Sequence, residues 1–227
     1  MIVSERNANE SARDYALRII KYNIVSLELK PGSRVNDHEL AAELGLSRTP
    51  VREALIELSK VAIVQMYPQK ASVIAPIDFS LMEEAYFMRE NLECAVVRRC
   101  CQMADGAMLA PLYENLALQE YYLNQPLQNN RLSYLDNEFH RLLFSVTGLT
   151  LVHSLLDTFS IHFTRIAALF YRENKEKEAV QMHRNLLDAI MRHDEEKSVQ
   201  IMKEHLSYFQ VEKEEIYNRF PQYFASK

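Results

Sequence analysis

The spacing of apolar residues predicts helices over the first part of the chain. From residue 12 to about residue 29, apolar side chains recur every three or four positions, which is the period of one helix face. A short helix is expected at 37–44, because Asn36 is a favourable cap and Gly45 a favourable stop. A third helix is expected at 48–59, where three apolar residues share one stripe.

Two short β-prone runs follow the third helix and predict a hairpin. The runs lie at 63–67 and 72–75, and the turn residues Pro-Gln-Lys separate them. Three helices followed by a two-stranded hairpin are the elements of a winged helix-turn-helix. We therefore predict a DNA-binding domain over residues 1–76.

Beyond Pro76 the pattern is helical almost to the end of the chain. Turn residues are scarce, and the apolar periodicity predicts helices at 80–103, 107–124, 129–147, 150–172, 176–192 and 195–219. The predicted fold is therefore mainly α. It consists of the N-terminal winged helix-turn-helix followed by an all-α six-helix antiparallel bundle over residues 77–227.

Composition and charge fit a helical protein of the cytoplasm. The 227 residues include 4 Gly and no Trp, and the net charge of −5 argues against a surface coated for nucleic acid. Residues 1–76 nevertheless hold 10 Lys and Arg against 9 Asp and Glu. The three cysteines match no zinc motif and indicate reduced thiols. No signal peptide or membrane span is expected, so we expect a soluble cytoplasmic protein without a membrane partner.

The start of the third predicted helix carries the chemistry expected of DNA recognition. Arg48 and Arg52 lie four residues apart and therefore share one face. Ser47 is a suitable cap residue just before them. A helix N-terminus also offers free N–H groups and partial positive charge to a phosphate, to which Thr49 could donate. The alternative is that the two arginines are solvated residues paired with glutamates of the same helix.

Four residues on three predicted helices are candidates for a metal site. Asp136 and His140 lie four apart on one helix and share a face. His183 and His205 lie at similar distances from the turn between the last two helices, so antiparallel packing brings them level. Three histidines and one aspartate suit a divalent transition metal such as zinc, nickel or manganese. The alternative is that all four are polar residues satisfied within the bundle.

A rival metal set lies on the helix predicted at 150–172. His153 and Asp157 are four residues apart, but His162 is nine beyond His153. That separation is about two and a half turns, so His162 points to a different side of the helix. The rival set is therefore less favourable.

Two segments of the N-terminal half resemble a known family. The segments LKPGSRVNDHELAAELGLSRTPVREALIEL and YPQKASVIAPID are similar to the DNA-binding domain of the GntR family of bacterial transcriptional regulators, over residues 12–78. The chain departs from the family pattern at Val61-Ala62, where Glu-Gly is usual, and at Ala71, where a wing glycine is usual. The resemblance implies that DNA is contacted by His38, Ser47, Arg48, Thr49 and Arg52, and by Lys70 at the wing tip.

Residues 78–219 resemble the helical effector-binding domain called FCD, found in the FadR-type branch of that family. The segments MRENLE, LDNEFHRLLF, MHRNLLDAI and KEHL carry the similarity. The resemblance implies that Asp136, His140, His183 and His205 hold a divalent metal. It also implies a small carboxylate effector beside the metal, with Arg89 as its partner and Arg165 as a second candidate. For Arg89 the alternative is an intrahelical pair with Glu93 or Glu84.

These observations predict a transcriptional repressor that binds an inverted repeat in double-stranded DNA as a homodimer. Its affinity for DNA is expected to respond to the carboxylate. We predict no catalytic residue, because no carboxylate is placed as a general base beside the metal. Two alternatives stay open: a metal-dependent enzyme built on the helical bundle, and a regulator whose metal is purely structural.

Overall fold

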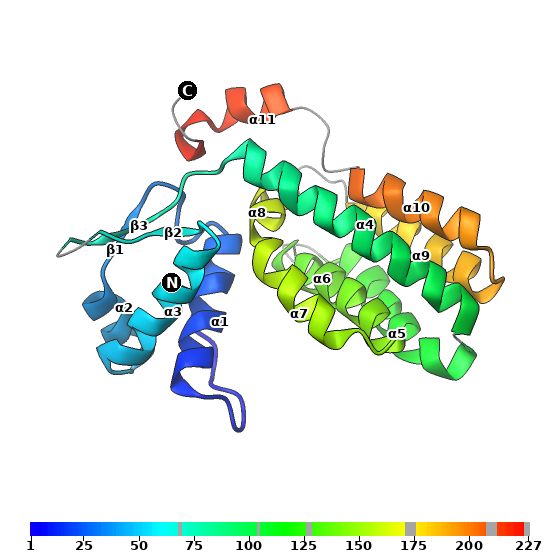
Figure 1. Cartoon of the computed structure of the whole chain (residues 1–227), viewed down its shortest axis with the longest axis horizontal. Helices are drawn as coiled ribbons and strands as arrows, with labels where there is room; N and C mark the ends of the chain where they lie inside the picture. Colours follow the sequence, from blue (N-terminus) through cyan, green and yellow to red (C-terminus); the bar gives the residue numbers. More distant parts are fainter. Residues whose placement is uncertain (68–69, 104, 126–128, 171–175, 208–212, 225–227) are drawn as a thin grey trace. The chain divides into compact units, whose positions relative to one another are not determined.

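A computed structural model describes the chain except for residues 68–69, 104, 126–128, 171–175, 208–212 and 225–227 (Figure 1). The described residues form two compact units. One unit contains Met1–Phe79 together with the C-terminal residues from Lys213 on, and the other contains Ser80–Glu212. Each unit buries apolar side chains of its own.

Three helices form the core of the first unit. They are α1 (Ala12–Val25), α2 (Asp37–Leu44) and α3 (Arg48–Lys60), and α1 packs against α3 through buried apolar faces. Asn36 caps α2 by accepting a hydrogen bond from the His38 N–H. Gly45 ends α2 in the left-handed conformation, with φ of 64°, which glycine adopts without a steric penalty. The helix predicted at 37–44 is confirmed.

A small antiparallel sheet completes the winged helix-turn-helix. Its strands are β1 (Arg34–Val35), β2 (Val64–Gln65) and β3 (Ser72–Ile74), in the order β1-β3-β2. The predicted hairpin corresponds to β2 and β3, while part of its turn, 68–69, lies outside the described residues. Strand β1 was not predicted, because two residues are too few to show an alternating pattern.

The C-terminal residues pack onto the segment that leaves the sheet. This part contains α11 (Lys213–Arg219) and the 3₁₀ turn η2 (Pro221–Tyr223). The ring of Phe224 stacks on Phe79, with centroids 4.7 Å apart, and the N–H of Ile77 donates to the carbonyl of Tyr223 at 2.7 Å. The first unit is therefore built from both ends of the chain.

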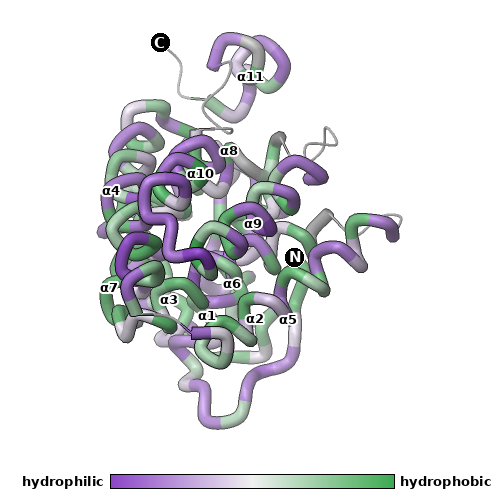
Figure 2. Tube along the Cα trace, turned by 90° about the vertical axis from the view of Figure 1, so that its right-hand side faces the viewer, coloured by the Kyte–Doolittle hydropathy of each residue, from purple (hydrophilic) through white to green (hydrophobic). Residues whose placement is uncertain are grey.

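The second unit is an array of helices. They are α4 (Phe79–Met103), α5 (Gly106–Leu123), α6 (Asn129–Val146), α7 (Thr150–Phe159), α8 (Ile161–Phe170), α9 (Glu176–Met191) and α10 (Glu195–Ser207). Helix α5 packs on α6 and α9, and α9 packs on α10. Hydrophobic and hydrophilic residues alternate along these helices, as expected where one face of each helix is buried (Figure 2). The mainly α fold is confirmed.

The structure divides the helix predicted at 150–172 into α7 and α8. Between them, the hydroxyl of Ser160 donates to the carbonyl of Leu156 at 2.9 Å, and the hydroxyl of Thr164 donates to the carbonyl of Ser160 at 3.2 Å. Such bonds from side chain to backbone compete with the helical pattern and bend helices. None of the described helices is both long enough and apolar enough to cross a bilayer.

Candidate metal centre and DNA-binding face

Four polar side chains meet inside the helical unit. Asp136 and His140 come from α6, His183 from α9 and His205 from α10, and their potential ligand atoms all lie within 4.8 Å of one another. Nε2 of His140 is 3.0 Å from Nε2 of His205. Oδ1 of Asp136 is 3.5 Å from Nε2 of His183 and 3.8 Å from Nε2 of His205. Ligand atoms about 2.1 Å from one ion lie about 3.0–3.5 Å apart. The His140–His205 and Asp136–His183 separations fall in that range, and the wider pairs would have to move closer to share one ion.

A hydrogen-bonded chain fixes the tautomer of His183. Nδ1 of His183 lies 2.8 Å from Oε1 of Gln119, and Nε2 of Gln119 donates to Oδ1 of Asn115 at 2.6 Å. Because Gln119 presents its carbonyl oxygen, Nδ1 of His183 is the donor and Nε2 carries the lone pair. That Nε2 atom is buried without a hydrogen-bond partner among the described residues. A metal at the cluster would satisfy it.

Glu93 of α4 orients His140 in a similar way. Its Oε2 atom accepts a hydrogen bond from Nδ1 of His140, and its Oε1 atom accepts one from Nε of Arg89 at 2.6 Å. Burial alone would raise the pKa of Glu93, but Arg89 and His140 hold it well below its usual range. The ionised carboxylate makes Nδ1 of His140 the donor, so in the neutral imidazole the lone pair is on Nε2, which faces the cluster.

Burial keeps the other two histidines neutral. It lowers the pKa of both His183 and His205 well below the ordinary value of 6.5, and neighbouring positive groups lower it further. A neutral imidazole is the form that binds a metal. The phenyl ring of Phe139 stacks on His183, with centroids 4.0 Å apart, and holds the plane of its ring.

The two candidate effector-binding arginines are both buried, on different helices. Arg89 pairs with Glu93, which is the alternative that the sequence left open, and its guanidinium carbon lies 4.6 Å from the centroid of the Phe163 ring. Arg165 of α8 has 1% of its surface exposed, and burial lowers the pKa of its guanidinium to about 10. A desolvated cation of this kind favours a nearby anion.

The rival set does not form a metal-ligating group in the part of the chain that the structure describes. His153 and Asp157 lie on α7, whereas His162 lies on α8, beyond the break at Ser160. Burial lowers the pKa of His153.

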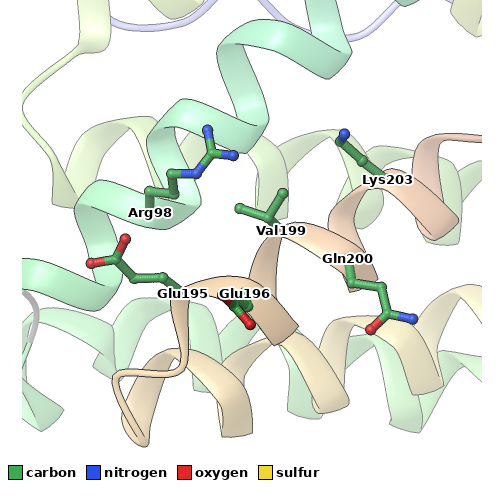
Figure 3. A pocket seen from close by; sticks show the side chains of 6 residues that line it. All are labelled: Arg98, Glu195, Glu196, Val199, Gln200 and Lys203. Atoms are coloured by element: carbon green, nitrogen blue, oxygen red, sulfur yellow. The ribbon is translucent and has the colours of Figure 1, made fainter.

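A surface pocket of about 380 Å³ lies between α4 and α10 (Figure 3). Its lining carries both signs of charge and contains none of the four cluster residues: Arg98, Glu195, Glu196, Val199, Gln200 and Lys203. The pocket is therefore separate from the candidate metal centre. Its mixed charge offers no selection for an anion.

The predicted DNA-contacting residues are all exposed: His38, Ser47, Arg48, Thr49, Arg52 and Lys70. Arg48 pairs with Asp37 of α2, Nη2 to Oδ1 at 3.0 Å, instead of with a glutamate of its own helix. An exposed pair of this kind contributes about 0–1 kcal/mol, so DNA could readily replace Asp37. Ser47 occupies the N-cap position of α3, as predicted, but its hydroxyl makes no capping hydrogen bond. The hydroxyl is therefore available for DNA.

Sequence reasoning missed the residues that support the ligands. Asn115, Gln119 and Glu93 are not spaced along the sequence as metal ligands are. Only the four-residue separation of Arg89 and Glu93 indicated an ion pair. It also missed Arg34, which is exposed on β1 opposite Val73 of the wing strand. Arg34 could be recognised as part of the wing only once β1 was known to pair with β3.

Two protein-family models match the chain. Residues 14–74 match the bacterial regulatory proteins of the gntR family, and residues 84–208 match the FCD domain. The chain is 30% identical over 225 residues to an uncharacterized HTH-type transcriptional regulator in an unstable DNA locus of Streptomyces ambofaciens, covering 99% of this chain and 94% of that protein. It is 25% identical over 206 residues to the HTH-type transcriptional repressor RspR of Escherichia coli, covering 90% of each.

Among solved structures, E. coli McbR/YncC superposes with a TM-score of 0.78 at 21% identity, covering 94% of this chain and 99% of that one. At that identity the likeness concerns the fold.

Proposed function

Because this chain belongs to the GntR family of bacterial transcriptional regulators and carries an FCD domain, we propose that it is a metal-binding repressor that responds to a small carboxylate. Members of this family regulate transcription by binding DNA and are not enzymes. The observation that carries the proposal is the cluster of the half-buried Asp136 with the buried His140, His183 and His205. It lies in the same chain as a recognition helix with exposed arginines.

The four cluster residues would hold a divalent transition metal, with zinc, nickel and manganese as candidates. The donor set supports this, because the pKa values of His183 and His205 leave both imidazoles neutral at pH 7. The buried lone pair on Nε2 of His183 supports it further. When bound, the ion would supply positive charge and coordination positions that attract an acidic ligand.

A small carboxylate is the proposed effector, with Arg89 and Arg165 as its protein partners. Nε of Arg89 already donates to Glu93, so the effector would take the N–H groups of its two Nη atoms. To regulate, the effector must bind the DNA-competent and DNA-incompetent states with different affinities.

A thermal-shift screen of dicarboxylates, tricarboxylates and sugar acids tests the proposed effector. We expect a ligand that stabilises the metal-loaded protein by about 2.7 kcal/mol at a hundredfold excess over Kd. Equal stabilisation of metal-free protein would show that the metal is purely structural.

We infer that the protein binds its operator as a homodimer, with one α3 helix in each half of an inverted repeat. The residues proposed to contact the DNA are His38, Ser47, Arg48, Thr49, Arg52 and Lys70. A regulator that binds bacterial DNA would act in the cytoplasm. Repression, rather than activation, is supported by the name of the relative RspR.

DNA selected from a random-sequence pool tests the recognition helix. Arg48→Ala and Arg52→Ala should each weaken binding to the selected DNA by about 1–3 kcal/mol, because each removes a contact made by α3. Arg13→Ala is the matched control, since Arg13 is an exposed arginine of the same unit on α1. The affinities are compared by fluorescence anisotropy at one salt concentration. Binding of both α3 variants as tight as that of the control would contradict the assignment of α3 as the recognition helix.

A further inference from the structure

We propose that Glu93 is a positioning residue that holds the metal ligand His140 and the effector partner Arg89 in one arrangement. The inference rests on the proposed function, because it concerns a metal at the four-residue cluster. Glu93 is not one of the four candidate ligands. It would act on metal binding through His140, and on carboxylate binding through Arg89.

Glu93 spans two side chains from different helices with its two oxygens. Oε1 accepts from Nε of Arg89 at 2.6 Å, one turn away on α4, and Oε2 accepts from Nδ1 of His140 on α6. Glu93 is 2% exposed and Arg89 is 5% exposed. Water therefore cannot easily replace either partner, and the two hydrogen bonds depend on the same buried carboxylate.

The contact with His140 bears on metal affinity. A carboxylate that accepts the N–H of a ligating imidazole fixes its tautomer and raises its basicity. Here it leaves the lone pair on Nε2 of His140, the atom that lies 3.0 Å from Nε2 of His205. Loss of such a partner typically weakens metal binding by about 10- to 100-fold.

The contact with Arg89 sets the direction of the guanidinium group. Glu93 engages Nε, and the ring of Phe163 lies 4.6 Å from the guanidinium carbon. A guanidinium is planar, so these two contacts fix where its Nη atoms point. A carboxylate bound there would share Arg89 with Glu93, and Glu93 in turn is shared with His140. Any effect of that carboxylate on metal affinity is matched by an equal effect of the metal on carboxylate affinity.

Zinc affinity in three proteins tests the role of Glu93. The proteins are the wild type, Glu93→Gln and Glu90→Gln, measured by competition with a chromophoric chelator. Glu90 is the matched control, because it lies on the same helix and its Oε1 atom is 3.8 Å from Nζ of Lys203, outside the proposed site. We expect Glu93→Gln to weaken zinc binding by about 10- to 100-fold, and Glu90→Gln to leave it within about twofold.

A second comparison shows whether Glu93 acts through His140. In a His140→Ala background the group that Glu93 orients is gone, so adding Glu93→Gln should change zinc affinity by less than about twofold. A general disturbance of the bundle would instead weaken binding by the same factor in both backgrounds.

Glu93→Gln leaves Arg89 as a buried unpaired charge, which can prevent folding. The double variant Arg89→Met/Glu93→Gln removes that charge and should show the same loss of zinc affinity. Wild-type zinc affinity in whichever of these two variants folds would overturn the inference. Equal losses of zinc affinity on adding Glu93→Gln to the wild type and to His140→Ala would also overturn it. Failure of the wild type itself to bind zinc, nickel or manganese would instead refute the proposed metal centre.

Discussion

The stability of the metal-free protein should fall steeply as the pH is lowered through the histidine range. In the folded state burial lowers the pKa of His183 and His205 well below 6.5. In the unfolded chain both histidines have the ordinary value of about 6.5. Below that pH the unfolded state binds protons that the folded state does not, so the free energy of unfolding decreases as the pH falls. Above that pH both histidines are neutral in the folded and in the unfolded state, so they add no pH dependence to the free energy of unfolding.

The size of the effect follows from the protonation of the unfolded state. Between pH 7.5 and pH 5.5, one such histidine lowers the free energy of unfolding by roughly 1 kcal/mol, and the two together lower it by roughly 2–3 kcal/mol. The loss continues until the pH reaches the lowered pKa values of the folded protein. Few domains have more than about 15 kcal/mol of stability, so the change is readily measured.

Urea unfolding of chelator-treated protein, followed by circular dichroism at several pH values, measures this loss. The comparison is with His183→Gln/His205→Gln, which lacks both groups, and with His38→Gln, which retains them and changes an exposed histidine. We expect the double variant to lose roughly 2–3 kcal/mol less than the other two proteins between pH 7.5 and pH 5.5. Equal losses in all three would refute the claim that His183 and His205 are neutral in the folded protein.

Two further predictions concern the support of the metal centre and the C-terminal residues. Gln119→Leu removes the acceptor for Nδ1 of His183 and should weaken zinc binding by about 10- to 100-fold. The control variant Gln200→Leu, on the surface of α10, should leave zinc affinity unchanged. Equal zinc affinity of the two variants in chelator competition would rule out a role for Gln119. Phe224→Ala removes the ring that stacks on Phe79 and should destabilise the first unit by about 3 kcal/mol. The control variant Gln222→Ala changes an exposed residue and should change the urea midpoint little. Unchanged stability of Phe224→Ala would show that the C-terminal residues do not stabilise that unit.

Local sequence signals were sufficient where short-range interactions decide the structure. Helix α2 has the predicted limits, because Asn36 and Gly45 supply its cap and its stop from adjacent positions. The level placement of His183 and His205 was also predictable, since it depends only on helix rise and a short turn. The break at Ser160 was not, because serine permits a helix and bends it only when its hydroxyl bonds to the backbone.

Features that depend on side chains from distant segments were beyond sequence reasoning. Glu93 and Gln119 are identified as supports only when their rotamers are seen against His140 and His183. The packing of Phe224 on Phe79 joins residues that lie far apart in the sequence. No periodicity or spacing in the sequence encodes contacts of this kind.

Metal content measured by elemental analysis is the most direct test of the central claim, that Asp136, His140, His183 and His205 hold a divalent ion. The proteins to compare, purified without chelator and then dialysed, are the wild type, His183→Ala/His205→Ala and His153→Ala, which alters the rival set. The proposed site predicts one equivalent of transition metal per chain in the wild type and in His153→Ala, and almost none in the double variant. Equal metal content in the double variant and the wild type would contradict it.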